Sequence, residues 1–311
     1  MYGARTGWTE QELAASSQTR RVGQVKSVNA RATPAHFHVF KFAPFAAGLS
    51  SDDRLLLSTR PRMIPWVPLA RAPIPGTQQD LCLYRRGEQL EFSIQISGYV
   101  SELMNSRVHA SEDALAELAC AAIVGRPAPH VLVGGLGMGF TLAAALKTLG
   151  PDSVVTVAEL VPEVVEWNRG PLGECAAFPL HDPRTQVHVG DVTELLRQGR
   201  GVYDAVLLDV DNGPEGMTHH GNDWLYSPSG LAAAQRTLRP GGVLAVWSAT
   251  PDDRFTRRLR QAGFRVDVRT VRARPGKGAR HTIWLAHRTQ DAAPTPARPP
   301  RRVRQHRSAR R

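Results

Sequence analysis

From residue 130 to residue 288, short apolar runs alternate with segments of helical periodicity. The runs followed by a helical segment are HVLVGG, SVVTVAEL, TQVHVGD, YDAVLLDV and VLAVWSA, and the closing runs are RVDVRTVRA and HTIWLAH. Strands that alternate with helices form crossover units, which build a parallel sheet with helices on both faces. The pattern therefore predicts an α/β domain with a seven-stranded, mostly parallel sheet that ends in an antiparallel pair.

A shorter β pattern precedes this domain. LCLYRRGEQLEFSIQI alternates apolar and polar residues around Gly87, which is typical of a hairpin, and SGYVSELMNSR is expected to continue the small sheet. Ser111 then precedes two acids and predicts the N-cap of a helix, SEDALAELACAAIV. We expect a small β-region over residues 63–110 and the larger α/β domain over residues 111–288.

The formal net charge of +11 comes from the two ends of the chain. Residues 1–62 hold nine basic and four acidic residues, residues 289–311 hold seven arginines and one aspartate, and residues 63–288 hold 23 of each sign. The tail, 289–311, is rich in proline and arginine and predicts disorder. We expect residues 1–62 to be a poorly ordered extension, either ahead of a natural start at Met63 or as a targeting peptide.

Several classes of protein are excluded by composition. No apolar run reaches the roughly 18 residues of a membrane span, and the first 20 residues lack the apolar stretch of a secretory signal. We therefore expect a soluble, cytoplasmic protein without a membrane partner. Cys82, Cys120 and Cys175 lie too far apart for a zinc or redox pair, so we expect buried thiols and no metal site.

The loop after the first parallel strand, GGLGMG, has glycines at Gly135, Gly137 and Gly139. Glycines let the backbone approach a ligand and direct a helix N-terminus at it. A loop that binds a dinucleotide needs glycines at positions i, i+2 and i+5. Position i+5 is Phe140 when counted from Gly135 and Leu142 when counted from Gly137, so the dinucleotide pattern is not met. The remaining GxGxG pattern is that of proteins that bind S-adenosylmethionine or its relatives.

Three acids end successive parallel strands. Glu159 is expected to accept hydrogen bonds from ribose hydroxyls. Alternatively, it is a structural acid at the N-terminus of the next helix. Asp191 is placed to accept from an adenine amino group, or to cap the helix that follows. Asp209 ends the fourth strand, at the sheet edge over the expected ligand crevice.

Five segments, taken in order, resemble the spermidine synthase family, the aminopropyltransferases. They are HVLVGGLGMG, VTVAELVPEVVEWNR, VHVGDVTELL, YDAVLLDVDNGPEG and LYSPSGLAAAQRTLRPGGVLAVWSA. The resemblance covers roughly residues 80–288. It implies the Rossmann-like class I S-adenosylmethionine-dependent methyltransferase fold, with a small β-region ahead of it.

Enzymes of this family move an aminopropyl group from decarboxylated S-adenosylmethionine to a polyamine amine and leave methylthioadenosine. The resemblance implies that Asp209 orients and deprotonates the attacking amine, whose ammonium has a pKa near 10.4 in water. It implies that Glu159 binds the ribose and Asp191 the adenine, with the adjacent Leu160 and Val192 beside the same ligand. The residues expected to meet the acceptor are Asp211, Asn212, Glu117 and Tyr226.

The chain departs from the family pattern at the amine-handling side. The family's glycine loop carries an aspartate, where this chain has Gly137 or Met138. The loop after Asp209 is two residues shorter, so the second family aspartate matches Asp211, Asn212 or nothing. The family's helix tyrosine corresponds to Leu115. A methyltransferase that uses intact S-adenosylmethionine on an unknown small substrate therefore stays open, as does a binding module without activity.

Charge within the core favours a small cationic, polyamine-like substrate. Residues 152–223 hold 13 acids against four arginines, which would make an acidic crevice or a solvated surface. Residues 254–280 hold nine arginines and one lysine but no interleaved aromatic platform on which bases could stack, so we do not expect nucleic acid as a partner. Family members are commonly dimers or tetramers, which leaves a homodimer open.

Overall fold

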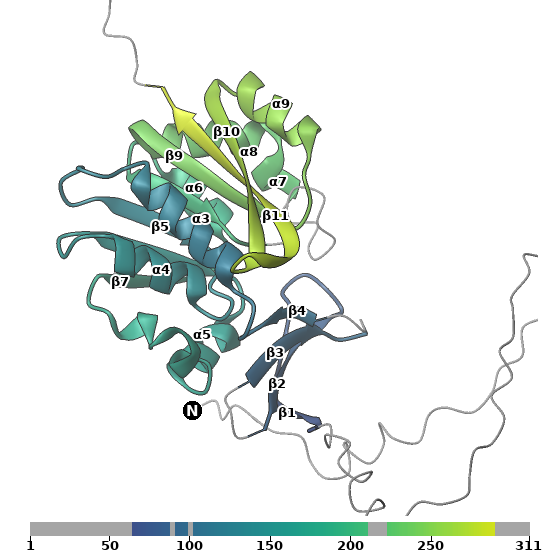
Figure 1. The fold of residues 1–311 in the computed structure, drawn as a ribbon. Helices are drawn as coiled ribbons and strands as arrows, with labels where there is room; N and C mark the ends of the chain where they lie inside the picture. The colour runs from purple at the N-terminus through teal and green to yellow at the C-terminus, as the bar shows by residue number, and fades with distance from the viewer. Residues whose placement is uncertain (1–63, 88–90, 99–101, 211–222, 290–311) are drawn as a thin grey trace, which may run out of the picture.

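The computed structural model describes residues 64–87, 91–98, 102–210 and 223–289, which form two β-sheets and the surrounding helices (Figure 1). The predicted extension, residues 1–62, and residues 290–311 of the predicted tail lie outside the described residues and stay predictions. Within the described ranges, no helix has the length and apolar character needed to cross a membrane.

The smaller sheet is antiparallel and has the order β1-β2-β3-β4. Its strands are β1 (Trp66–Pro73), β2 (Asp80–Arg86), β3 (Glu91–Ile96) and β4 (Glu102–Asn105). Strands β2 and β3 pair from Leu81 opposite Ile96 to Arg86 opposite Glu91, which confirms the predicted hairpin. Leu83, Phe92 and Ile94 are buried in the same apolar core as the larger domain.

The larger sheet has seven strands in the order β10-β11-β9-β8-β5-β6-β7. They are β5 (His130–Gly134), β6 (Val154–Glu159), β7 (Thr185–Val189), β8 (Tyr203–Leu208), β9 (Leu238–Ser248), β10 (Phe264–Arg274) and β11 (Lys277–Arg288). Strands β5 to β9 pair in parallel, whereas β11 runs antiparallel to both β9 and β10. The predicted seven-stranded sheet with a closing antiparallel pair is confirmed.

Helices cover both faces of this sheet (Figure 1). Core residues from α3 (Ala110–Ala121), α4 (Phe140–Thr148) and α5 (Pro162–Arg169) pack with one face, and those from α6 (Val192–Gln198), α8 (Pro228–Thr237) and α9 (Asp253–Gln261) with the other. The short α7 (Asp223–Tyr226) and two 3-10 turns, Gly173–Ala176 and Pro179–His181, complete the described elements.

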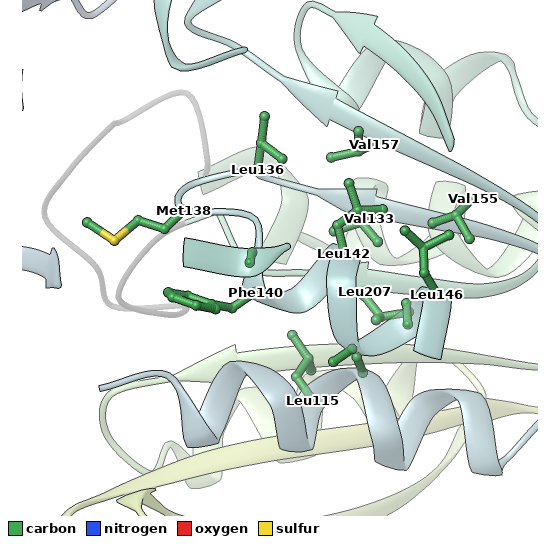
Figure 2. Close-up of a cluster of buried hydrophobic side chains, with 14 of the residues drawn as sticks. Leu115, Val133, Leu136, Met138, Phe140, Leu142, Leu146, Val155, Val157 and Leu207 are labelled. Atoms are coloured by element: carbon green, nitrogen blue, oxygen red, sulfur yellow. The ribbon is translucent and has the colours of Figure 1, made fainter. Parts of the chain in front are cut away.

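Strand β8 shows why its sequence reads as a continuous apolar run. All six of its residues are buried, and successive side chains point to opposite faces. Ala205 and Leu207 join the first core, and Val206 and Leu208 join the second. Figure 2 shows the first core, where Leu115 of α3 and Leu142 of α4 lie beside strand residues such as Leu207.

The start of α3 differs from its prediction. His109 occupies the N-cap position, and the Ser111 side chain makes no capping hydrogen bond. The Ser111 hydroxyl instead donates to Glu112 Oε2 at 2.5 Å. Because α3 already begins at Ala110, Ser111 lies inside the first turn, beyond the position from which a side-chain oxygen accepts from the free amides. The prediction that Ser111 is the N-cap was therefore wrong, since the N-cap lies two residues earlier, at His109.

Candidate active site

A cavity of about 440 Å³ lies between the small sheet and the carboxyl edge of the large sheet. Its walls include Ile94 and Met104 from the small sheet and residues that follow β5, β6, β7 and β8. Strands β6 and β7 lie on one side of β5, and the next strand in the sequence, β8, lies on the other side of β5. Ligands of open α/β sheets bind where the strand order reverses in this way.

The glycine loop forms one wall of the cavity. Gly135 and Gly137 line it and have φ values of 88° and 52°, a conformation that side chains disfavour. A Cβ atom on Gly135 would lie 2.3 Å from the Asp209 carbonyl oxygen. Gly139 is not among the described lining residues and occupies the N-cap position of α4. The loop thus brings backbone amides to the cavity and packs against the backbone of Asp209.

Glu159 is buried at the end of β6 and lines the cavity. Its Oε2 accepts from the Leu136 amide and its Oε1 from the Val161 amide, each at 2.9 Å. Burial raises the pKa of Glu159, and these amides act in the opposite direction by favouring the carboxylate. Each carboxylate oxygen can accept a further hydrogen bond, so the predicted ribose contact is compatible with the amide contacts.

Asp191 is both a helix cap and a cavity residue. Its Oδ1 accepts from the Thr193 amide at 2.8 Å, so it is the N-cap of α6, and it also lines the cavity. The adjacent Val192 and, after Glu159, Leu160 line the cavity too. Two apolar side chains and two acids therefore lie at the ends of β6 and β7, an arrangement that suits a nucleoside.

Asp209 lies just beyond β8 on the other side of the strand reversal. Its Oδ2 accepts from the Thr141 hydroxyl at 2.6 Å, and its backbone amide donates to the Gly134 carbonyl at 2.9 Å. Burial raises the pKa of the Asp209 carboxyl, and the Thr141 hydrogen bond lowers it. Asp209 is therefore a carboxyl group fixed in direction and made a better proton acceptor by its surroundings.

No protein-family model matches the chain. Curated relatives include the polyamine aminopropyltransferase of Mycobacterium tuberculosis, 33% identical over 182 residues, which are 55% of this chain and 33% of that protein. The polyamine aminopropyltransferase of Nitrosomonas europaea is 31% identical over 127 residues, 41% of this chain and 37% of that protein. The chain is therefore similar in sequence to polyamine aminopropyltransferases over about half of its length. It spans about a third of the length of the M. tuberculosis relative.

Solved aminopropyltransferases share the fold. A spermidine synthase in complex with the transition state analogue AdoDATO has a TM-score of 0.55 and 18% identity, over 72% of this chain and 73% of that one. Spermidine synthase from Thermotoga maritima has a TM-score of 0.54 and 19% identity, over 68% and 70% of the two chains. The small antiparallel sheet ahead of a seven-stranded sheet is thus the architecture predicted from the aminopropyltransferase motifs.

Two residues expected beside the acceptor are not among the residues that line the cavity. Glu117 is exposed on α3, because five residues turn a helix by about 140° and carry it away from the face of Glu112. Tyr226 is buried in the second core, where its ring lies 5.6 Å from that of Phe255. Asp211 and Asn212 lie outside the described residues, so their predicted roles stay predictions.

The cavity also contains residues that the sequence motifs did not indicate. Glu112 lines it from the first turn of α3, Thr141 from α4 and Trp247 from the end of β9. Burial, followed by the negative charge of Asp209, raises the pKa of Glu112 to about 7. Glu112 does not stand out in the sequence because an acid in a first helical turn is usually explained by the helix dipole. Trp247 does not stand out because a tryptophan in an apolar strand is usually a core residue.

Proposed function

We propose that the protein transfers an aminopropyl group from decarboxylated S-adenosylmethionine to a polyamine or a related small amine. The observation that carries the proposal is the charge of the cavity. Its charged lining residues in the described part of the chain are all acids, namely Glu112, Glu159, Asp191 and Asp209. No lysine, arginine or histidine is among the described lining residues. Such a cavity favours a cationic donor and a cationic acceptor.

The nucleoside end of the cavity fits the adenosine part of the donor. We assign the ribose hydroxyls to Glu159 and the adenine to Asp191, with Leu160 and Val192 covering the base. Intact S-adenosylmethionine carries a carboxylate, which would enter this cavity without a cationic partner among the described residues. Its decarboxylated form lacks that group and keeps an ammonium. The charge of the lining therefore favours the decarboxylated donor over the methyltransferase alternative.

The amine end supplies the proton acceptor that the reaction needs. The donor provides a carbon activated by the adjacent sulfonium. Asp209 binds the acceptor's ammonium and removes one proton, and Thr141 fixes the direction of the carboxyl group. The freed nitrogen lone pair forms the new C–N bond while the C–S bond breaks and its electrons stay on sulfur. Holding both substrates in one cavity supplies the remaining acceleration through proximity and orientation.

The reaction is tested by incubating the purified full chain with putrescine and each donor in turn. The products are identified by mass. Methylthioadenosine and an aminopropylated amine, formed with the decarboxylated donor, would support the proposal. Adenosylhomocysteine formed from intact S-adenosylmethionine would support methylation instead, and no product with either donor across a panel of di- and polyamines would reject aminopropyl transfer.

We also propose that the reaction takes place in the cytoplasm. Cys82, Cys120 and Cys175 are all free thiols, which is the state expected in a reducing compartment. Burial raises the pKa of the Cys120 thiol to about 12, so this side chain stays protonated and unreactive. Fractionation of cells that express the tagged full chain would test the location, and recovery only in a membrane or secreted fraction would contradict it.

A further inference from the structure

Glu112 is the part of the cavity that the proposed function leaves without a role. It lies in the first turn of α3, whose buried side chains are small or apolar apart from Ser111. Ser111 is fully buried, and its hydroxyl donates to Glu112 Oε2 at 2.5 Å. The same hydroxyl lies 2.8 Å from His281 Nδ1 on β11. With the Ser111 proton directed at Glu112, the histidine nitrogen is the donor to the Ser111 oxygen.

His281 is itself held in place. Its ring meets the ring of Trp247 edge to face, with centroids 4.7 Å apart, and Trp247 lines the cavity. Burial lowers the pKa of His281, which keeps the ring neutral at neutral pH and able to donate from one nitrogen. Two strands of the C-terminal part of the sheet therefore fix the hydroxyl that binds Glu112.

Glu112 of α3 and Asp209, which follows β8, line the same cavity although they are far apart in the sequence. Each carboxyl group accepts a hydrogen bond from one side-chain hydroxyl. Ser111 serves Glu112, and Thr141 serves Asp209 at 2.6 Å. The negative charge of Asp209, after burial, makes the Glu112 carboxyl harder to ionise and raises its pKa. The other ionisable group that acts on Glu112 is His109, whose effect is small and opposite, and which is paired with Asp113 at 2.8 Å.

We propose that Glu112 and Asp209, which face the same cavity and each accept from one side-chain hydroxyl, act as a carboxyl pair that takes the proton from the acceptor amine when both are ionised. Ser111, oriented by His281, positions Glu112 for this role. The inference rests on the proposed function and adds to it a second catalytic carboxyl group, drawn from α3. Two carboxyls that face one cavity titrate together, because the second ionisation adds a like charge to the same cavity.

The proton balance of aminopropyl transfer calls for such a pair. An acceptor ammonium and a sulfonium donor give a secondary ammonium, neutral methylthioadenosine and one free proton. The ionised pair takes that proton from the ammonium before the C–N bond forms, and the proton passes to solvent when the products leave. A lone aspartate with an ordinary pKa would be a poor base toward an ammonium whose pKa is near 10.4, whereas a pair with a raised pKa is a better one.

The pair can be tested without turnover. Carbon-13 NMR of the full chain, labelled at its carboxyl carbons, is recorded as a function of pH. We expect a carboxyl resonance that titrates near pH 7 in the wild-type protein, is lost in Glu112→Gln and moves to lower pH in Asp209→Asn. The matched control is Glu174→Gln, an exposed acid outside the cavity, which should leave the resonance unchanged. A resonance that titrates at the same pH in the wild-type protein and in Asp209→Asn would overturn the coupling between the two carboxyl groups.

The catalytic role is tested by pH profiles of methylthioadenosine release. Glu112→Gln keeps an acceptor for Ser111 but removes the charge, so the maximal rate should fall about 10- to 100-fold. Its acid limb should move to lower pH, by about one unit or more, because Asp209 loses a like-charged neighbour. Ser111→Ala removes a hydrogen bond to the ionised form of Glu112, so its acid limb should move about half a unit to one unit higher.

Opposite shifts in these two variants would not arise from a general loss of packing. His109→Gln serves as a control for the titration of His109 and should retain the acid limb. An unchanged rate and profile in Glu112→Gln, in a wild-type protein that releases methylthioadenosine, would overturn the pair and leave the proposed function intact. A wild-type protein that releases none from any amine would reject the proposed function and the proton role together, while the NMR titration would still report the coupling.

Discussion

The two ends of the cavity hold their carboxyl groups in different ways. Glu159, at the end that we assign to the nucleoside, accepts from the Leu136 and Val161 backbone amides. Asp209 and Glu112, at the end that we assign to the amine, accept from the side-chain hydroxyls of Thr141 and Ser111. Backbone amides that donate to a carboxylate favour its ionised form, which can accept further hydrogen bonds from ligand hydroxyls. Two neighbouring carboxyls with one hydroxyl donor each keep raised pKa values and remain able to exchange protons.

The ends also differ in how they are assembled. The nucleoside end is built from residues at the ends of adjacent parallel strands, β5 to β7. The amine end combines residues from α3, α4, β8 and β9, supported by His281 of β11. The first arrangement follows from a repeated local unit, whereas the second depends on the packing of distant segments. We therefore expect substitutions at the two ends to separate binding from turnover.

The largest effect is expected from Asp209→Asn. The variant keeps the shape of the side chain but cannot take a proton, so the maximal rate of methylthioadenosine release should fall at least 100-fold and up to about 10,000-fold. Steady-state kinetics with the decarboxylated donor and putrescine would measure it. A rate within about threefold of wild type would remove Asp209 from the proton transfer.

Gly135→Ala should disturb both ends at once, because the glycine loop touches the Asp209 backbone. The new Cβ would lie 2.3 Å from the Asp209 carbonyl oxygen, at a φ of 88° that alanine disfavours. Such strain typically costs about 1–3 kcal/mol of the free energy of unfolding, and displacement of the loop adds to it. Denaturant unfolding would measure the loss. Gly150→Ala, where a Cβ would meet nothing within 4 Å, is the control and should be close to neutral.

Thr141→Val should have a smaller effect that is confined to the amine end. The substitution removes the hydroxyl that donates to Asp209, and since this hydrogen bond lowers the pKa of Asp209, that pKa should rise. The ionised form then appears at higher pH, so the acid limb of the rate profile should move upward, with a loss of about tenfold in rate at neutral pH. Thr141→Ser, which restores the hydroxyl, should return both values toward wild type.

The fold could be predicted because its signals are local. Alternating strands and helices fixed the sheet and its closing antiparallel pair, and the hairpin around Gly87 followed from a two-residue period. Glu159, Asp191 and Asp209 could be predicted as cavity residues because each follows a parallel strand, and the carboxyl ends of such strands meet at one edge.

The amine end could not be predicted in the same way, because the sequence does not fix how α3 is rotated against the sheet. Glu112 and Glu117 are both acids of that helix, and the family motif favoured Glu117, which is exposed. Tyr226 and Trp247 show the same limit, since each is an aromatic residue near a strand or helix end. The packing of the second core buries Tyr226, whereas Trp247 faces the cavity and His281.

The division between the two ends is tested most directly by calorimetric titration of methylthioadenosine into the wild-type, Glu159→Gln and Asp209→Asn proteins. Loss of the carboxylate contacts to the ribose should weaken binding to Glu159→Gln about 100-fold, or 2.7 kcal/mol. Binding to Asp209→Asn should stay within about tenfold, or 1.4 kcal/mol, of wild type. The reverse order, with Asp209→Asn weakened and Glu159→Gln unaffected, would contradict the assignment of the nucleoside to the Glu159 end.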